Sequence, residues 1–483
     1  MNRFLLISLI YILCLNLSLG QERLGLSLEN YAGINSASLN PANAFMSPHK
    51  WDINILSSGV FFDNNYAFLK NTNTLNLLKD IENIKIVYDP EKKSETSYPP
   101  GTKLIDFSKR KKESFFFASG NFTGPSFSIK INKTNILGVV SAFRFYGSFP
   151  KIHKELGFYT YLDKPYFQSY PISSFDLGYM SWHEYGINYV KNIRGYSTNT
   201  LLGITVKYLS GNEAMFFENK KTIQFEQMPN DSIAALDHIN LQYGYTSSSL
   251  RFNYFQFKHN GTGVSLDLGA TMVFGEDIKN YKFRIGVSLL DVGFINYNKN
   301  SLEYTININT FKAFDISGFG AIERFSQLDS ARQIINEQLN NNPENRTVSN
   351  SFKMWLPMAM SIQFDYSFSE LFNINGILLQ RIITEGHHVT RGNLLAISPR
   401  IEHRWFSVST PLILYNWKDF RIGTSIRFAY LILGSDNVFS LFSNHAQFSG
   451  SDIYVGLKFN PFTIHKRHKY SRNLNKNIKC YEF

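Results

Sequence analysis

Histidine, serine and acidic side chains that stand close together in the sequence are the first candidates for catalysis or metal binding. His183-Glu184 begins like a zinc-protease motif, but Ile187 stands where that motif needs its second histidine. Gly286-Val287-Ser288-Leu289-Leu290 lacks the second glycine of a nucleophile elbow. His387-His388 follows a glycine in a turn-like segment, where we expect a solvated pair. The sequence therefore predicts no catalytic residue, no metal site and no cofactor, and we expect a protein that is not an enzyme.

Basic residues at the polar positions of alternating segments are the second group of candidates. A guanidinium or ammonium group that faces a ligand holds a carboxylate through charge-assisted hydrogen bonds. The residues that we expect to contact a ligand in this way are Lys207, Arg284, Arg421 and Arg427. The alternative is that these cations only pair with acidic side chains that face the same way, such as Asp267 and Asp365.

The tripeptide Asn40-Pro41-Ala42 is the third candidate and lies in an N-terminal segment, residues 21–50. Asn is a favourable N-cap, and Pro is favoured at the first helical position. The tripeptide therefore predicts a short helix or helical turn. Two interpretations remain open: it belongs to a functional segment, or it is only the structural start of a first strand that begins at Trp51.

The elements that must position these side chains show a period of two residues over long stretches. From Met358 to Phe368, apolar residues alternate with small or polar ones, and the segment from Phe420 to Tyr430 repeats the pattern. Such alternation places one face of a strand in an apolar medium and the other face against polar groups. Because a strand crosses a bilayer in about 9–11 residues, we interpret these segments as membrane-spanning strands.

Length and composition agree with one large barrel. The 483 residues include 43 Phe and 27 Tyr, and aromatic residues make up 16% of the chain. Transmembrane barrels carry aromatic girdles at both interfaces and, in bacteria, an even number of strands. We therefore predict an all-β fold, a transmembrane antiparallel up-and-down β-barrel of about 14 strands over residues 51–462. The lumen of such a barrel is wider than its own side chains fill.

The two ends of the chain are predicted to lie outside the barrel wall. Residues 1–20 form a predicted signal peptide, with Arg3, the apolar stretch Phe4–Leu15 and small residues up to Gly20. With cleavage near Gly20 we expect the protein in the bacterial outer membrane, with Cys480 as its single cysteine and no intrachain disulfide. Residues 463–483 form a predicted basic C-terminal tail.

The net charge of the chain indicates which partners its surface would bind. The formal net charge is +11, and a basic surface suits outer-membrane lipid headgroups and lipopolysaccharide, which we expect as partners. Lys and Arg are spread along the chain without a nucleic-acid-binding motif, so we expect no nucleic acid as a partner. The stretch Ala321–Asn341 has helical spacing, which predicts a helix that packs on the barrel rim or contacts a partner.

Four sets of short motifs resemble a known group of proteins. They are Asn30-Tyr31-Ala32-Gly33 followed by Ser38–Ala42, Gly286–Gly293, Trp355-Leu356-Pro357 and Asp452–Phe459. These motifs resemble Bacteroidota outer-membrane barrels of uncharacterised function, which are distantly similar to the long-chain fatty-acid transporter family. The resemblance implies that residues 21–50 fold into the barrel as a plug that contains Asn40, Pro41 and Ala42. It also implies passive transport of small hydrophobic molecules such as fatty acids, which enter from outside and leave laterally through the wall.

A second function comes from the same group of barrels. Related Bacteroidota barrels are accessory parts of type IX secretion and gliding machineries, so the alternative is a barrel that transports nothing and serves as a scaffold for secretion or surface proteins. A lumen blocked by bulky side chains favours the scaffold. A continuous apolar path from a surface opening to a gap in the wall favours transport.

Overall fold

The computed structural model describes residues 22–79, 85–88, 98–108, 113–154, 165–228, 233–237, 239–246, 258–275, 278, 281–308, 312–315, 346–442 and 447–460. The predicted signal peptide (residues 1–20), the predicted helix at residues 321–341 and the predicted tail at residues 463–483 lie outside the described residues.

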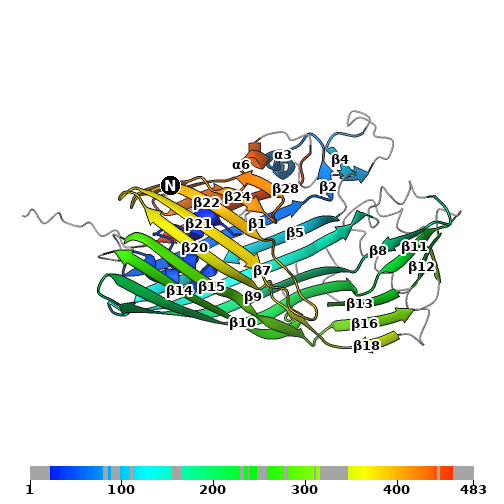
Figure 1. Ribbon diagram of the computed structural model, residues 1–483, viewed down its shortest axis with the longest axis horizontal. Coiled ribbons are helices and arrows are strands. Elements are labelled where there is room, and N and C mark those ends of the chain that lie inside the picture. Colours follow the sequence, from blue (N-terminus) through cyan, green and yellow to red (C-terminus); the bar gives the residue numbers. More distant parts are fainter. Residues whose placement is uncertain are drawn as a thin grey trace, which may run out of the picture.

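A closed antiparallel barrel forms the body of the protein (Figure 1). Within the described ranges, 14 barrel strands follow one another in chain order, and several of them consist of two or three consecutive segments. In order they are β1 (Trp51–Asn64), β5 and β6 (Glu113–Thr123, Ser126–Lys130), β7 (Asn135–His153), β9 (Phe175–Arg194), β10 (Thr198–Asn219), β13 and β14 (Ile239–Thr246, Gly261–Gly275), β15 and β16 (Tyr281–Tyr297, Ser301–Ile308), β18, β19 and β20 (Arg346–Ser349, Phe352–Trp355, Ala359–Ser367), β21 (Phe372–Arg381), β22 (Leu394–Glu402), β23 and β24 (Phe406–Ser409, Leu412–Tyr415), β25 and β26 (Asp419–Ile422, Thr424–Phe428), β27 (Leu431–Ser435) and β28 (Gly450–Phe459).

The last strand closes the barrel on the first. β28 pairs with β1 in antiparallel register, from Ile53 opposite Phe459 to Asp63 opposite Gly450. An even number of strands makes this closing pair antiparallel like the others. The predicted fold class, an all-β antiparallel barrel of about 14 strands, is confirmed.

Smaller elements sit on the connections between barrel strands. Two small sheets are formed by β2, β3 and β4 (Ala67–Leu69, Lys85–Tyr88, Thr102–Phe107) and by β8, β11, β12 and β17 (Ser169–Ile172, Ile223–Gln227, Ile233–Asp237, Lys312–Asp315). Two short helices, α3 (Thr74–Lys79) and α6 (Val438–Phe442), pack on each other above β28 (Figure 1). Among the described residues, no helix is long and apolar enough to cross a membrane.

The alternation in the sequence separates a lipid face from a luminal face. On β10, Ile204 and Val206 are exposed on the outside of the wall, while Thr205 and Lys207 are buried inside it. On the neighbouring β9, Ile187 is exposed and Asn188 is buried in the same way. Apolar residues on the outside and polar residues on the inside are the pattern of a barrel that sits in a bilayer.

The two ends of the barrel differ in their connections. Tight turns join the strands at one end, such as residues 195–197 between β9 and β10 and residues 368–371 between β20 and β21. Longer connections join them at the other end, such as residues 382–393 between β21 and β22. Because bacterial barrels place short turns in the periplasm and longer loops outside the cell, we refer to the second end as the outer end.

The described wall is uneven in height and is interrupted beside β25. β9 and β10 are 20 and 22 residues long, whereas β27 has five residues. β27 pairs with β26 and, from Leu431 to Gly434, with β28, and within the described residues β25 pairs with β24 alone. Next to β25, the described part of the wall therefore continues through the connection that contains α6 rather than through a strand.

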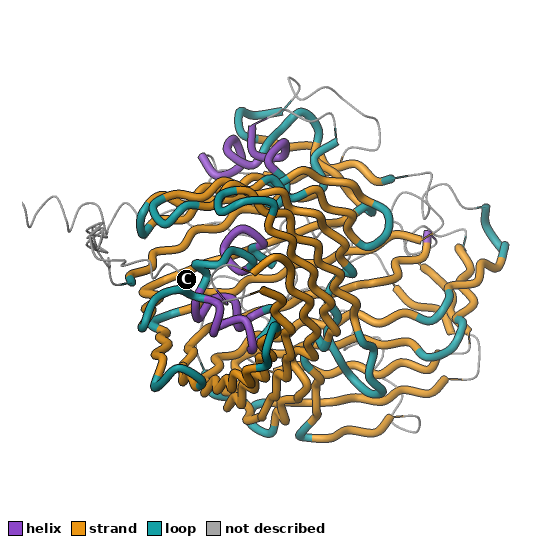
Figure 2. Tube along the Cα trace, turned by 60° about the vertical axis from the view of Figure 1, so that its left-hand side comes forward, coloured by secondary structure: helices purple, strands orange, loops and turns teal. Residues whose placement is uncertain are grey.

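The N-terminal segment occupies the interior. It contains α2 (Leu24–Ser27) and two 3-10 helices, η1 (Gly33–Ser38) and η2 (Pro41–Met46), which Figure 2 shows enclosed by the strands. Nearly all side chains of these helices are buried. The segment therefore lies inside the barrel, where its apolar side chains contact the inner faces of the strands.

Candidate luminal site

Asn40 holds the N-terminal segment to two neighbouring barrel strands, β14 and β15. Its side-chain oxygen accepts a hydrogen bond from the Ala42 amide at 3.0 Å, and Pro41 is the first residue of η2, so the predicted N-cap and helical turn are confirmed. Its side-chain amide donates to the Thr271 hydroxyl at 3.1 Å and lies 3.4 Å from the carbonyl oxygens of Ala270 and Val287. One side chain thus caps a helix and binds the wall.

Glycines in the wall make room for this turn. Gly203 on β10 and Gly269 on β14 are direct partners in the sheet. A Cβ on Gly203 would lie 2.3 Å from the Ala42 backbone nitrogen, and a Cβ on Gly269 would lie 2.1 Å from the Asn40 side-chain oxygen. Any side chain at these positions would therefore overlap the Asn40-Pro41-Ala42 turn.

Barrel side chains also bind the backbone carbonyls of the segment. The Leu28 carbonyl accepts hydrogen bonds from Arg284 at 3.3 Å and from Arg400 at 3.1 Å. The Leu39 carbonyl accepts from Ser288 at 2.7 Å and from Gln363 at 3.2 Å. Buried carbonyls that would otherwise lack partners are thus satisfied by the wall. That residues 21–50 act as a plug stays a prediction.

A cluster of opposite charges fills the middle of the lumen. Lys207 lies 2.7 Å from Asp267 and 3.1 Å from Asp291. Asp291 also accepts from Arg144 at 2.8 Å and pairs with Arg391, which in turn lies 3.2 Å from Glu22 of the N-terminal segment. Cations and carboxylates at this depth are stable only because they pair with one another. A cavity of about 50 Å³ beside them is lined by cations such as Lys207 and by carboxylates such as Asp267.

A second ionic cluster lies nearer the periplasmic end. Asp365 on β20 accepts from Arg284 and from Arg400, each at 2.9 Å. Arg427 on β26 lies 2.8 Å from Glu29 of the N-terminal segment. These pairs again join the wall to the segment inside it.

The four predicted ligand contacts all point into the barrel and all have a carboxylate partner. Lys207 pairs with Asp267 and Asp291, Arg284 with Asp365, Arg421 with Asp63, and Arg427 with Glu29. The structure places Arg284 of β15 and Arg427 of β26 in the second ionic cluster, whereas Lys207 of β10 and Arg421 of β25 lie apart from them and from each other. That they contact a ligand stays a prediction.

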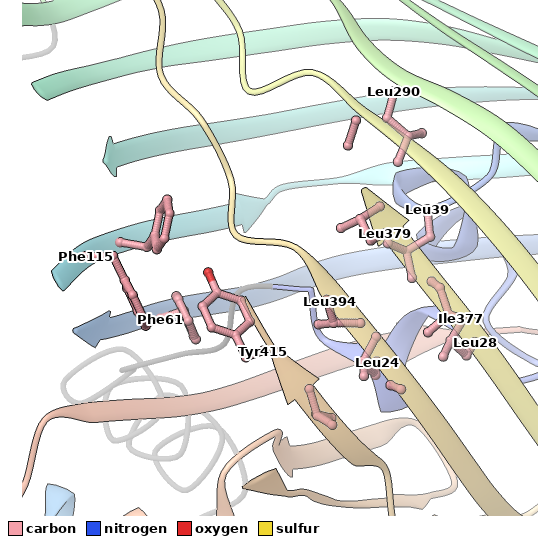
Figure 3. Close-up of a cluster of buried hydrophobic side chains, with 14 residues drawn as sticks. Leu24, Leu28, Leu39, Phe61, Phe115, Leu290, Ile377, Leu379, Leu394 and Tyr415 are labelled. Atoms are coloured by element: carbon pink, nitrogen blue, oxygen red, sulfur yellow. The ribbon is translucent and has the colours of Figure 1, made fainter. Parts of the chain in front are cut away.

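An apolar stripe also lines the inner wall, on β1, β5, β21, β22 and β24. We use this name for the inward side chains Phe61, Phe115, Phe117, Ile377, Leu379, Leu394, Ala396, Ile413 and Tyr415. Figure 3 shows Phe61, Phe115 and Tyr415 at one end of the stripe and Leu24 and Leu28 of the N-terminal segment at the other. The aromatic end belongs to the outer ends of β1, β5 and β24. The stripe therefore runs from the outer end of the barrel to the buried segment.

The break in the wall lies beside the aromatic end of the stripe. A cavity of about 350 Å³ is lined there by Phe420 and Arg421 of β25, Phe439 of α6 and Asp63 of β1. The Arg421 guanidinium pairs with Asp63 and stacks over the rings of Phe61 and Tyr415, at 5.3 and 4.7 Å. Of the four predicted contacts, Arg421 is the one that touches both a sizeable cavity and the apolar stripe.

The sequence patterns did not predict the position of several luminal residues. His387 is not solvated as expected: its side chain is 12% exposed and lies between Glu218 and Glu303. Arg391 and Glu22 likewise stand outside the alternating segments, so periodicity carried no signal for them. Arg144 and Glu184 do occupy luminal positions on β7 and β9, and a charge at a luminal position within an alternating strand was a signal that could have found them.

Similar folds occur among solved barrel structures. A TodX deltaS2S3 mutant, described as a monoaromatic hydrocarbon channel, is 8% identical, with 89% of this chain and 94% of that chain covered and a TM-score of 0.41. The Pseudomonas putida toluene transporter TodX is 7% identical, with 87% and 92% covered and a TM-score of 0.38. A Pseudomonas aeruginosa FadL homologue is 8% identical, with 88% and 94% covered and a TM-score of 0.24.

Sequence comparison assigns the family. No curated protein matches the sequence. Residues 41–436, which include the Pro41-Ala42 half of the buried turn and most of the barrel, match DUF5723, a family of unknown function. The chain belongs to the DUF5723 family.

Proposed function

We propose that this outer-membrane barrel passively transports small hydrophobic molecules such as fatty acids. The observation that carries the proposal is the apolar stripe, which runs along the inner wall from the outer end to Leu24 and Leu28 of the N-terminal segment. Buried apolar side chains along one side of a lumen stabilise an apolar solute more than water does. A polar solute would gain nothing from this surface.

The break beside β25 is the proposed opening for the solute. It places a cavity of about 350 Å³ between the lipid-exposed ring of Phe420, which is 66% exposed, and the first aromatic residues of the stripe. A fatty acid that enters here meets Arg421 first. Its carboxylate can take the place of Asp63 on the guanidinium, because both form the same charge-assisted hydrogen bonds.

The N-terminal segment is the proposed gate of this route. Leu24 and Leu28 pack against the stripe, so a solute that moves along it must displace them. The numerous bonds between the segment and the wall, such as those of Leu28 and Leu39 carbonyls, oppose release of the whole segment. We therefore expect local movement of α2 rather than loss of residues 22–50.

The experiment compares dodecanoate with dodecanol, which has the same tail and no charge. Uptake is measured in cells that lack other fatty-acid channels, with and without the protein. The wild-type protein is expected to raise the uptake of both. Arg421→Met is expected to lower dodecanoate uptake about tenfold, as for one lost charge-assisted bond, and to leave dodecanol uptake unchanged.

Lys191→Met is the matched control, because Lys191 is an exposed cation on β9. It should leave the uptake of both solutes unchanged. Uptake of neither solute above that of cells without the protein, while the folded barrel is present in the outer membrane, would refute the transport proposal.

A scaffold role in a secretion or surface machinery is the second candidate. The observation that favours it is the filled lumen: charged clusters and an aromatic cluster around Trp182, Phe216 and Phe352 are buried in the interior beside the apolar stripe. The absence of uptake and of dodecanoate binding by the purified barrel would favour this role over transport.

A further inference from the structure

The connection between β21 and β22, residues 382–393, folds back into the outer end of the lumen. The His387 carbonyl accepts from the Trp355 amide at 2.9 Å, and the Thr390 amide donates to the Ser148 hydroxyl at 3.0 Å. Val389 is buried in the aromatic cluster that contains Phe216. We call residues 382–393 the latch loop, since they join opposite parts of the wall.

The latch loop also reaches the N-terminal segment. Arg391 is buried, pairs with Asp291 of β15 and lies 3.2 Å from Glu22. A displacement of the loop would therefore expose Val389 and pull Arg391 away from Glu22. The loop links the outer end of the barrel physically to the segment inside it.

His387 faces a carboxylate with each ring nitrogen. Its Nδ1 lies 2.8 Å from Glu218 Oε1 of β10, and its Nε2 lies 3.0 Å from Glu303 Oε1 of β16. The ring stacks on Phe216, with the centroids 3.6 Å apart. A neutral imidazole has a single N–H, and a carboxylate accepts but cannot donate. With both carboxyl groups ionised, both contacts are hydrogen bonds when the imidazole carries both protons.

His388 repeats the arrangement on the neighbouring strand. Its Nδ1 lies 2.7 Å from the Gly386 carbonyl oxygen, and its Nε2 lies 3.3 Å from Asp176 Oδ2 of β9. Carbonyl and carboxylate oxygens both accept, so this ring too needs two protons. Among the described residues, the charged groups around the pair are Glu218, Glu303 and Asp176, and Arg381 interacts with Asp176.

We propose that the latch loop is a proton-operated closure of the outer end of the barrel. With both imidazoles doubly protonated, the loop is held to β9, β10 and β16 and the outer end is closed. When each imidazole loses a proton, one of its two ring nitrogens turns a lone pair toward an acceptor oxygen, and the loop is released. This closure is independent of which solute, if any, passes through the barrel.

The electrostatic environment of the two histidines also favours their protonated forms. Burial by itself would lower the pKa of His387, but the hydrogen bonds to Glu218 and Glu303 outweigh it and raise the pKa. The pKa of His388 is raised in the same way by Asp176 and the Gly386 carbonyl. Because these pKa values are raised on closure, closure is most stable below about pH 6.5, the ordinary histidine pKa, and weakens as the pH rises through the raised values.

The experiment is hydrogen exchange of the full mature chain in detergent between about pH 6 and pH 9, corrected for the intrinsic rates. Protection of peptide 383–391 is expected to fall by at least about tenfold across this range, while peptide 372–380 of β21 stays protected and reports an intact barrel. Equal protection of peptide 383–391 at both pH values would overturn the proposal.

Two double variants distinguish an effect of protonation from an effect of the histidine side chains themselves. His387→Arg with His388→Arg keeps several donors at every pH, so peptide 383–391 should stay protected throughout. His387→Gln with His388→Gln cannot donate from opposite edges of the side chain, so the peptide should exchange fast at both pH values. His403→Gln, in a turn at the periplasmic end, is the control and should behave like the wild-type chain. A wild-type pH profile in the arginine variant would contradict the proposal, and none of these readouts depends on transport.

Discussion

Asn40 of the N-terminal segment and Gly269 of β14 are in direct contact, so closely that a Cβ on the glycine would lie 2.1 Å from the asparagine side-chain oxygen. Gly203, the strand partner of Gly269, leaves the same room for the Ala42 backbone. The interior segment and the wall are therefore fitted to each other at a place where two adjacent strands carry no side chain.

Gly203→Ala is expected to destabilise the barrel by about 1–3 kcal/mol, because the added methyl meets backbone atoms of the segment that cannot turn away. The measurement is urea unfolding in detergent, together with the rate of proteolysis of residues 22–50. Gly376→Ala on β21 is the control, since nothing lies within 4 Å of its added methyl, and it should leave both unchanged. Equal effects of the two variants would show that the contact does not matter.

Asn40→Asp separates the two roles of the Asn40 side chain. The carboxylate still accepts from the Ala42 amide but cannot donate to Thr271, whereas Asn40→Ala loses both bonds. We expect Asn40→Ala to lower the free energy of unfolding by about 1–2 kcal/mol through the lost cap. The loss should be larger once the lost bonds to the wall are included. Asn40→Asp should keep η2 and loosen it from β14. Proteolysis of the segment measures the difference, and an Asn40→Asp rate equal to that of the wild-type chain would argue against a separate wall contact.

Asp365→Asn is expected to destabilise the barrel more than Arg284→Met. Asp365 neutralises both Arg284 and Arg400, so its loss leaves two buried cations without their shared partner, at a cost of about 3–5 kcal/mol. Arg284→Met leaves Asp365 paired with Arg400 and should cost less. Urea midpoints of the two variants in the same detergent test this order, and the reverse order would contradict the assignment of Asp365 as the shared partner.

Phe117→Asn is expected to lower the uptake of both dodecanoate and dodecanol several-fold, since it places an amide in the apolar stripe. Phe352→Asn is the matched control, a second buried phenylalanine that lies in the other apolar cluster of the lumen. Both variants should lose stability, so uptake is compared per folded barrel. If Phe352→Asn lowers uptake as much as Phe117→Asn does, the stripe is not the route.

Local patterns predicted much of the wall. The alternation from Met358 to Phe368 corresponds to β20 at Ala359–Ser367, because the burial of every second residue is a property of one strand between lipid and lumen. The helical turn after Asn40 was equally local, since a cap concerns residues two or three apart. Stretches without alternation carried no such signal, and one of them contains β8 (Ser169–Ile172).

Such local patterns did not predict most of the contacts in the candidate site. Lys207, Arg284, Arg421 and Arg427 were recognised as inward cations because of their positions within strands, but their partners were not all foreseen. Arg391 and Glu22 are 369 residues apart in the sequence, and neither belongs to an alternating segment. Such residues come within hydrogen-bonding distance of each other only when the barrel closes.

By itself, the sequence determined the fold class, the lipid and luminal faces of the strands and the capped turn at Asn40, because these depend on the chemistry of residues near one another in the chain. The tertiary structure decided which buried charges pair, where the wall is broken beside β25, and that His387 lies between two carboxylates. Such contacts join residues from distant strands, and the strength of a buried charge pair depends on distances that only the closed barrel sets.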